Sequence, residues 1–192
     1  DPGLRLVQAA REANVDVEVL PGPTAVTTAY VASGCTNARF YFGGFFPRKE
    51  AERTATLQAL GTLDAALIFY ESPNRLVSAL ESLAHAFPQR NVAVCRELTK
   101  LHEEVVRGLV PDVRDTFAAR ERTGVIKGEI VLVVDGPSEA EHDHLAETAE
   151  EAARIRAAEL KQQNMRNKDI ARALVEEFGI ARNLAYTIAL EG

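Results

Sequence analysis

Apolar runs that alternate with helix-like segments predict an α/β protein. The clearest run covers residues 65–71 and is typical of a strand buried on both faces. Ser72 is a suitable helix N-cap and Pro73 a suitable first helical residue, so we expect a turn from strand to helix within about two residues. Ligands bind at such strand ends in open α/β sheets, so we expect Glu71 and Arg75 to border a crevice. The alternative is that both charges are ordinary surface residues.

The same alternation along the chain predicts a mixed α/β sheet covered by helices. A stretch rich in aromatic residues and glycine precedes Pro47, where we place a domain boundary. Strands are expected at residues 15–19, 65–71, 92–96, 104–108 and 129–135. Helices are expected at residues 4–13, 24–33, 50–60, 73–87 and 112–122.

The C-terminal part of the sequence predicts a separate helical unit. Residues 137–144 are acidic and polar, which is typical of a linker between residues 47–136 and residues 145–192. A charged helix is expected over residues 145–163, followed by two amphipathic helices on either side of Gly179.

Charge is distributed unevenly. The net charge is −6, but the segment from Arg154 to Arg182 holds seven basic residues and four acids, a local charge of +3. This asymmetry favours a different partner for the C-terminal unit, with a nucleic acid as one class and a mixed-charge surface helix as the alternative. No run of about 18 apolar residues is present, so we expect a cytoplasmic protein without a membrane span. Cys35 and Cys95 lie in apolar surroundings and are expected to be free, buried thiols.

A second turn into a helix is expected at Pro21-Gly22-Pro23-Thr24-Ala25. The free N–H groups of a helix N-terminus can bind a polar ligand, although a purely structural turn explains the motif equally well.

Several motifs in the same order resemble a known family. Taken together, they are similar to the signatures of the RsmI-type 16S ribosomal RNA (cytidine-2′-O)-methyltransferases, members of the tetrapyrrole methylase superfamily (class III methyltransferases). The resemblance covers residues 1 to about 136. Its motifs are Pro21-Gly22-Pro23-Thr24-Ala25, Gly44-Phe45-Phe46-Pro47-Arg48-Lys49, Ile68-Phe69-Tyr70-Glu71-Ser72-Pro73-Asn74-Arg75, Arg96-Glu97-Leu98-Thr99-Lys100 and Lys127-Gly128-Glu129-Ile130-Val131.

The resemblance implies a two-domain α/β enzyme that works as a homodimer and binds S-adenosyl-L-methionine between its domains. Its substrate would be a cytidine in the decoding region of 16S rRNA, methylated on the ribose 2′-oxygen. Residues 1–46 would be the second half of an N-terminal domain, and we expect weak cofactor binding by this chain alone. By motif position, the cofactor would contact Thr24, Ala25, Tyr70, Glu71, Leu98, Ile130 and Val131.

We expect Thr24 and Glu71 to converge on one pocket.

Methyl transfer to a ribose oxygen also needs a proton acceptor and cations along the RNA. The candidate acceptors are Glu71, Glu103, Glu104 and, if desolvation lowers its pKa, Lys100. The candidate RNA-binding cations are Arg48, Lys49, Arg75, Arg96 and Lys100, with structural salt bridges among residues 90–107 as the alternative.

Two other functions remain open. One is a methyltransferase of the same fold acting on a tetrapyrrole or corrin precursor, which would favour an apolar trough over basic residues beside Glu71. The other is a non-enzymatic nucleic-acid-binding protein that acts through residues 145–192.

Overall fold

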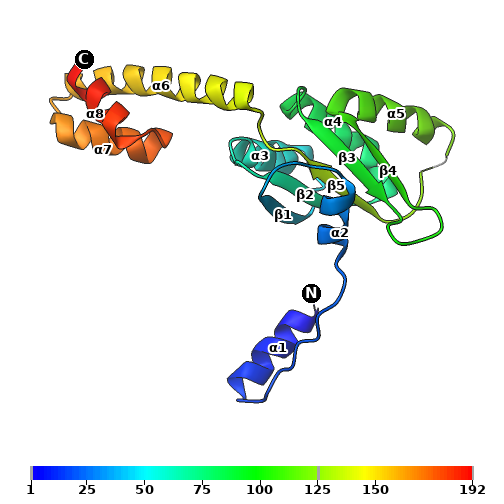
Figure 1. Cartoon of the computed structure of the whole chain (residues 1–192). Coiled ribbons are helices and arrows are strands. Elements are labelled where there is room, and N and C mark those ends of the chain that lie inside the picture. The colour runs from blue at the N-terminus through cyan, green and yellow to red at the C-terminus, as the bar shows by residue number, and fades with distance from the viewer. Residues whose placement is uncertain (1, 125, 192) are drawn as a thin grey trace.

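A five-stranded mixed sheet forms the centre of the computed structural model, which describes residues 2–124 and 126–191 (Figure 1). The strand order is β1-β2-β5-β3-β4, and among the described strands only β1 and β2 pair in parallel. The mixed α/β sheet expected from the sequence is therefore confirmed. The strands are β1 (Phe40–Phe45), β2 (Ala66–Glu71), β3 (Asn91–Arg96), β4 (Glu104–Leu109) and β5 (Ile130–Val134).

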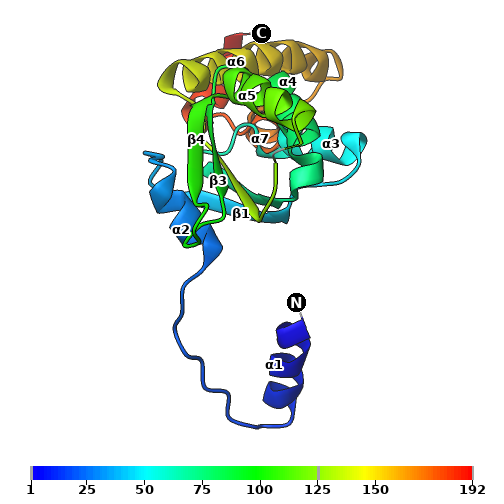
Figure 2. The same ribbon diagram turned by 90° about the vertical axis from the view of Figure 1, so that its right-hand side faces the viewer.

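Helices surround this sheet and extend beyond it. In Figure 1, α6 projects away from the sheet and carries α7 and α8 at its far end. Figure 2 shows α1 at the opposite extreme, joined to α2 by an extended segment. The helices are α1 (Pro2–Glu12), α2 (Ala25–Ala32), α3 (Glu50–Leu60), α4 (Leu76–Ala86), α5 (Val110–Arg122), α6 (Glu139–Gln162), α7 (Asn167–Phe178) and α8 (Arg182–Glu191), with a short 3-10 turn, η1 (Pro73–Arg75), before α4.

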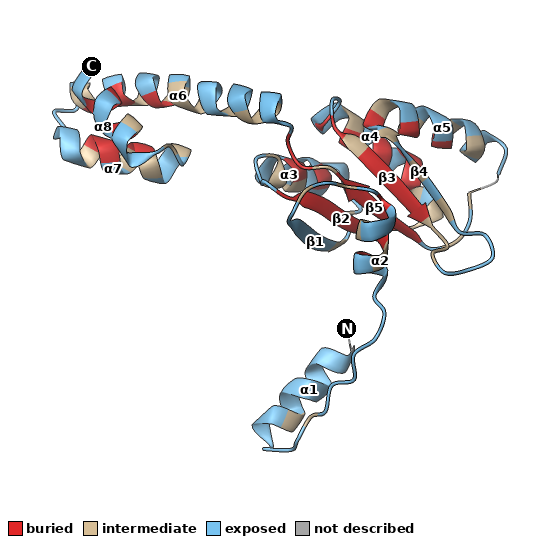
Figure 3. Ribbon diagram, viewed as in Figure 1, coloured by how far each residue is buried: buried red, intermediate tan, exposed pale blue. Residues whose placement is uncertain are grey.

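The two faces of the sheet are covered by different helices. Leu67, Phe69 and Leu132 point to the face where α3, α4 and α5 build the larger core. Ile68 and Val131 point to the other face, where α2 packs. Successive strand residues alternate between faces, so an unbroken apolar run is what a strand covered on both sides requires. Figure 3 shows the resulting buried strands at the centre of the sheet.

The C-terminal helices have a core of their own. Ala157 of α6, Leu174 of α7 and Ile188 of α8 are buried together. Gly179 ends α7 in the left-handed conformation at φ 66°, as expected for a helix C-cap. The helical unit predicted from the amphipathic pattern is therefore present.

The strand predicted for residues 15–19 is wrong. These residues belong to the irregular segment between α1 and α2, and their alternating Val15 and Val19 are exposed. A strand is stable only when a neighbouring strand takes its backbone hydrogen bonds. None of the described strands pairs with this segment.

Two predicted boundaries also need correction. Phe40 to Phe42 of β1 pair with β2, so the boundary placed between residues 46 and 47 falls within one sheet. The predicted linker at residues 137–144 is mostly helical, because α6 begins at Glu139 rather than at Leu145. Ser138 caps this helix: its Oγ accepts a hydrogen bond from Glu141 N–H at 3.2 Å.

Both cysteines are free: Cys95 is buried and Cys35 is half-buried. Within residues 2–124 and 126–191, no helix is both long and apolar enough to cross a lipid bilayer.

Candidate functional site

A cavity of about 590 Å³ lies where the parallel strands β1 and β2 end. It contains the residues that follow the two strands and the first residues of the turn into α4. Carboxyl ends of adjacent parallel strands are the usual ligand-binding edge of an α/β sheet. The lining consists of Phe45, Phe46, Pro47, Arg48, Ser72, Asn74 and Arg75.

Glu71 lies beside this cavity at the end of β2, and its side chain is fully buried. Its Oε1 atom is 2.6 Å from Arg75 Nη2 and accepts a hydrogen bond from Ser72 N–H at 2.7 Å. Arg75 Nε also donates to Ser72 Oγ at 3.1 Å. The strand-to-helix turn predicted at this point is therefore closed by a buried ion pair.

Two atoms of this ion pair have no partner. Glu71 Oε2 and Arg75 Nη1 are buried without a hydrogen bond among the described residues. A buried polar atom without a partner costs about 1–3 kcal/mol, and such atoms are uncommon in native proteins. The pair thus has unused hydrogen-bonding capacity beside a cavity.

Aromatic side chains form the adjoining wall. The Tyr70 ring contacts Phe42 and Phe45 edge-on, with ring centroids 4.9 and 5.5 Å apart. Phe45 is 68% exposed although it lines the cavity. An exposed aromatic side chain beside cations can stack on a nucleobase.

The predicted cofactor contacts divide between the two faces of the sheet. Tyr70, Leu98 and Val131 pack in the cluster beneath α2, and Tyr70 is the direct register partner of Val131. Glu71 and Ile130, the next pair along the same two strands, have the opposite orientation, and Ile130 is part of the larger core. The predicted contacts therefore lie on both faces of the sheet near this strand end.

Thr24 and Ala25 lie on the α2 face. Thr24 is the N-cap of α2, and its Oγ1 accepts a hydrogen bond from Thr27 N–H at 3.2 Å. Both residues are exposed, and neither lines the cavity beside Glu71. The pocket expected to join Thr24 and Glu71 therefore remains a prediction.

Lys100 does not meet the condition set for a proton acceptor. Its Nζ lies 3.0 Å from Glu97 Oε1 and 3.2 Å from Glu129 Oε2. Hydrogen bonds to Glu97 and Glu129 raise the pKa of Lys100, which is opposite to the lowering that a neutral amine would require. In turn, the Glu129 backbone N–H and Lys100 hold the pKa of Glu97 below its ordinary value. These charges stabilise the turn between β3 and β4.

Glu103 and Glu104 also have structural partners. Glu103 Oε2 accepts a hydrogen bond from Thr99 N–H at 2.5 Å. Glu104 lies 3.0 Å from Arg96 Nε and 2.8 Å from Arg120 Nη1. Burial raises the pKa of Glu104, but the bonds from Arg120 and Arg96 outweigh burial, and the net pKa is lowered. Neither carboxylate lines the cavity.

The predicted RNA-binding cations fall into two groups. Arg48 and Arg75 line the cavity, and Lys49 next to them pairs with Glu52 at 3.2 Å. Arg96 and Lys100 lie at the β3–β4 turn and are engaged by carboxylates. Arg48 has no carboxylate partner within the part of the chain that the structure describes, so its charge is available to a ligand.

Arg53 is a residue that sequence reasoning missed. It is buried, its Nε donates to Pro47 O at 2.8 Å, and its Nη1 donates to Ser78 O at 2.9 Å. Its guanidinium also lies over the Phe46 ring. Arg53 therefore ties the cavity wall at Phe46 and Pro47 to α4. Nothing in the sequence around it distinguishes it from a surface arginine of an amphipathic helix.

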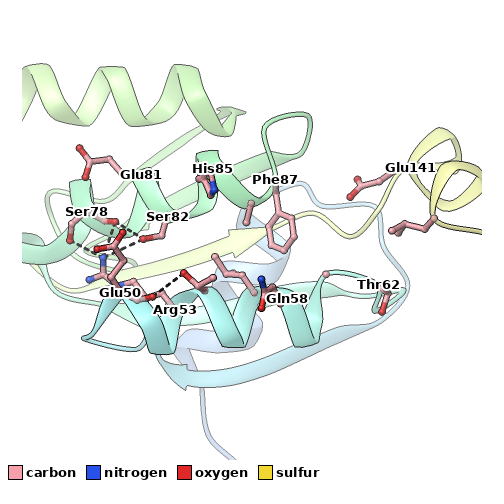
Figure 4. Close-up of a pocket in the computed structure, with 15 residues that line it drawn as sticks. Glu50, Arg53, Gln58, Thr62, Ser78, Glu81, Ser82, His85, Phe87 and Glu141 are labelled. Carbon is pink, nitrogen blue, oxygen red and sulfur yellow. Dashed lines mark hydrogen bonds between the residues drawn. The ribbon is translucent and has the colours of Figure 1, made fainter. Parts of the chain in front are cut away.

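A larger cavity of about 730 Å³ lies between α3 and α4 (Figure 4). Arg53, Ser78 and Ser82 meet at one end, and Phe87 and Glu141 lie at the other. None of the predicted site residues lines it. The cavity beside Glu71 is therefore the better candidate site, although it is the smaller of the two.

Comparison with known proteins identifies the family to which the chain is similar. The family of Tetrapyrrole (Corrin/Porphyrin) Methylases matches residues 1–114. A protein named "Ribosomal RNA small subunit methyltransferase I" from Micromonospora olivasterospora is 40% identical over 187 residues, which are 97% of this chain and 57% of that protein. A protein of the same name from Mycobacterium tuberculosis (strain ATCC 25618 / H37Rv) is 49% identical over 140 residues, 71% of this chain and 46% of that protein. The chain thus spans about half the length of these curated relatives.

A solved structure supports the fold. The crystal structure of the methyltransferase CobJ matches with a TM-score of 0.51 at 20% sequence identity, covering 69% of this chain and 56% of that one. The resemblance read from the motifs is thereby confirmed, and the chain belongs to the tetrapyrrole (corrin/porphyrin) methylase family.

Proposed function

We propose that this chain is part of an S-adenosyl-L-methionine-dependent enzyme that methylates the ribose 2′-oxygen of a decoding-region cytidine in 16S rRNA, in the cytoplasm. The names of its relatives and its family membership support this assignment. The observation that carries it is the cavity at the ends of β1 and β2, where Arg48 and Arg75 lie beside an exposed Phe45 and the buried Glu71. Cations and an aromatic ring in one cavity suit a nucleotide.

S-adenosyl-L-methionine supplies the methyl group when it is bound. The residues that fit it best lie on the α2 face: Tyr70 and Leu98 are half-buried apolar residues packed on the cluster that contains the buried Val131, and Thr24 with Ala25 opens α2 with free helix N–H groups. The unpartnered Glu71 Oε2 lies at the end of the same strand as Tyr70.

Positioning supplies much of the rate in a transfer of this kind. We propose that Arg48 and Arg75 hold a phosphate and that Phe45 stacks on a base. Glu71 holds Arg75 in place through the 2.6 Å contact, and it is our candidate proton acceptor because, among the predicted carboxylates, it is the one paired with a residue that lines the cavity. Glu104 is the weaker candidate, since its lowered pKa makes it a poor base.

A homodimer is also part of this proposal. Phe40 and Phe42 on the edge strand β1 and Val31 on α2 are exposed, which leaves apolar surface for another subunit or domain. Light scattering at two protein concentrations measures the molecular mass of the particle in solution. A mass that corresponds to one chain at both concentrations would contradict the dimer.

The direct test incubates isolated small ribosomal subunits with the complete gene product and S-adenosyl-L-methionine. We expect one additional 2′-O-methylated cytidine, located by nucleoside mass and fragment mapping. Methylation of a corrin precursor with no product on ribosomal RNA would favour the alternative substrate and contradict the proposal.

A further inference from the structure

The corner between α6 and α7 has an unusual composition. Residues 161–168 read Lys-Gln-Gln-Asn-Met-Arg-Asn-Lys, which is three cations, four amides and one methionine without any acid. We call this segment the α6–α7 corner. It stands out because the rest of α6 is rich in glutamate.

The polar side chains of the α6–α7 corner are free to bind a ligand. Residues 162–168 are exposed and Lys161 is half-buried. Within residues 2–124 and 126–191, none of the three cations lies within ion-pair distance of a carboxylate. By contrast, Arg154 on the same helix contacts Glu150 at 2.7 Å and Glu191 at 2.5 Å. The corner therefore presents positive charge that the protein itself does not neutralise.

The corner is also held in a defined shape. Asn164 takes a left-handed conformation at φ 58°, and Met165 N–H donates to Leu160 O at 3.2 Å. Leu160 before the corner and Ile170 after it are both buried in the core of the helical unit. A folded corner loses less conformational entropy on binding than a disordered basic tail does.

α6 fixes this corner at a distance from the cavity. The helix has 24 residues, which corresponds to about 36 Å at 1.5 Å per residue, and Figure 1 shows it leading away from the sheet. Its first turn is anchored by Glu141, whose carboxylate lies 2.6 Å from Arg90 Nη2 and 3.0 Å from Arg90 Nε. Arg90 is only 2% exposed, donates to Gly61 O at 2.5 Å and lies over the Phe87 ring. Because this buried contact includes several charge-assisted hydrogen bonds, it fixes the start of α6 relative to the sheet.

We propose that the α6–α7 corner binds the sugar–phosphate backbone of the RNA substrate, as a second contact remote from the cavity at Arg48 and Arg75. Cations and amides are the side chains that contact phosphate and sugar oxygens without reading sequence. A protein partner would require a buried aromatic or aliphatic anchor, and the corner offers only Met165, which is 37% exposed. This inference rests on the proposed function for the nature of the ligand.

The test compares two double variants of the complete gene product. Arg166→Gln with Lys168→Gln removes two charges from the corner, and Arg114→Gln with Arg122→Gln removes two from α5. Affinity for a 16S rRNA transcript is measured over a range of salt concentrations. We expect the slope of log affinity against log salt to fall in magnitude by about 1.4–1.8 for the corner variant, as for two lost phosphate contacts, and to change little for the α5 control. Circular dichroism melting confirms that both variants are folded.

Equal slopes for the parent and the corner variant would overturn the inference, and so would equal losses in both double variants. Methylation of small subunits is measured in parallel to separate this outcome from failure of the proposed function. If the parent methylates the subunits and the corner variant keeps its salt slope, only the corner proposal fails. If only the corner variant shows a smaller salt slope, but neither the parent nor any variant methylates the small subunits, the RNA contact stands and the proposed function fails. Binding of an acidic protein without any RNA effect would also contradict the proposal.

Discussion

Arg75 Nη2 lies 2.6 Å from Glu71 Oε1, where β2 turns into α4. The contact places a guanidinium on the wall of the cavity and a carboxylate entirely in the interior. A buried charge is tolerated only when a partner compensates it. This pair therefore couples the stability of the fold to the chemistry of the cavity.

Loss of one partner of this pair should destabilise the fold. Arg75→Met leaves the Glu71 carboxylate buried with only Ser72 N–H, and we expect the free energy of unfolding to fall by about 3 kcal/mol. The double variant Glu71→Leu with Arg75→Met should recover a large part of that loss, because no buried charge remains. Urea denaturation measures both. A double variant as unstable as the single one would show that packing, and not the uncompensated charge, is what the pair supplies.

Arg53 should matter for both stability and binding. Arg53→Met removes the bonds to Pro47 O and Ser78 O, so we expect a loss of about 1–3 kcal/mol in stability and weaker RNA binding as the wall at Pro47 loosens. Arg48→Gln is the matched control: it should weaken RNA binding while leaving the urea midpoint unchanged, because Arg48 is exposed. If the RNA affinity of Arg53→Met were unaltered, Arg53 would not support RNA binding at the cavity.

Gly128 and Gly124 offer a comparison of steric and conformational effects. Both have positive φ, so alanine at either position costs about 1–2 kcal/mol from the backbone alone. At Gly124 a Cβ would meet open space, whereas at Gly128 it would lie 2.4 Å from Glu97 Cγ. We therefore expect Gly128→Ala to lower the urea midpoint more than Gly124→Ala does. Equal midpoints would mean that Glu97 moves aside without cost.

Glu104 gives a prediction for pH dependence. Its pKa is lowered in the folded protein, so as the pH falls the unfolded chain takes up the proton first. The stabilisation from Glu104 is complete above the ordinary glutamate range, about pH 5, and is lost as the pH falls through the lower folded pKa. We expect Glu104→Gln to be less stable than the parent at pH 7, with a difference that shrinks as the pH falls below the ordinary glutamate range. A difference in urea midpoint that is constant over this range would contradict the assignment.

The sequence predicted the elements that depend on local patterns. The buried runs at β2 and β5 follow from apolar periodicity, and the structure confirms them. The chain also turns after β2 at Ser72 and Pro73 as predicted, but Ser72 makes no side-chain cap hydrogen bond and Pro73–Arg75 form a 3-10 turn before α4. The amphipathic pattern likewise predicted the helical unit around Gly179. These features need no knowledge of distant contacts.

The failures arise from contacts between distant residues. Val15 to Val19 alternate like a strand, but a strand exists only where a partner pairs with it. The sequence around Arg53 carries no sign of its burial, which depends on Ser78 of another helix. Lys100 has a raised pKa because it hydrogen-bonds first to Glu97 and also to Glu129, which is far along the chain.

The central claim is that the cavity at the ends of β1 and β2 holds the RNA ribose during methyl transfer. The most direct measurement is methylation of small ribosomal subunits by the complete gene product, with Arg48→Gln and Arg75→Gln introduced together and Arg114→Gln with Arg122→Gln as the control. We predict at least a tenfold loss of 2′-O-methylcytidine for the cavity variant and none for the control. Undiminished methylation by a folded cavity variant would contradict the account.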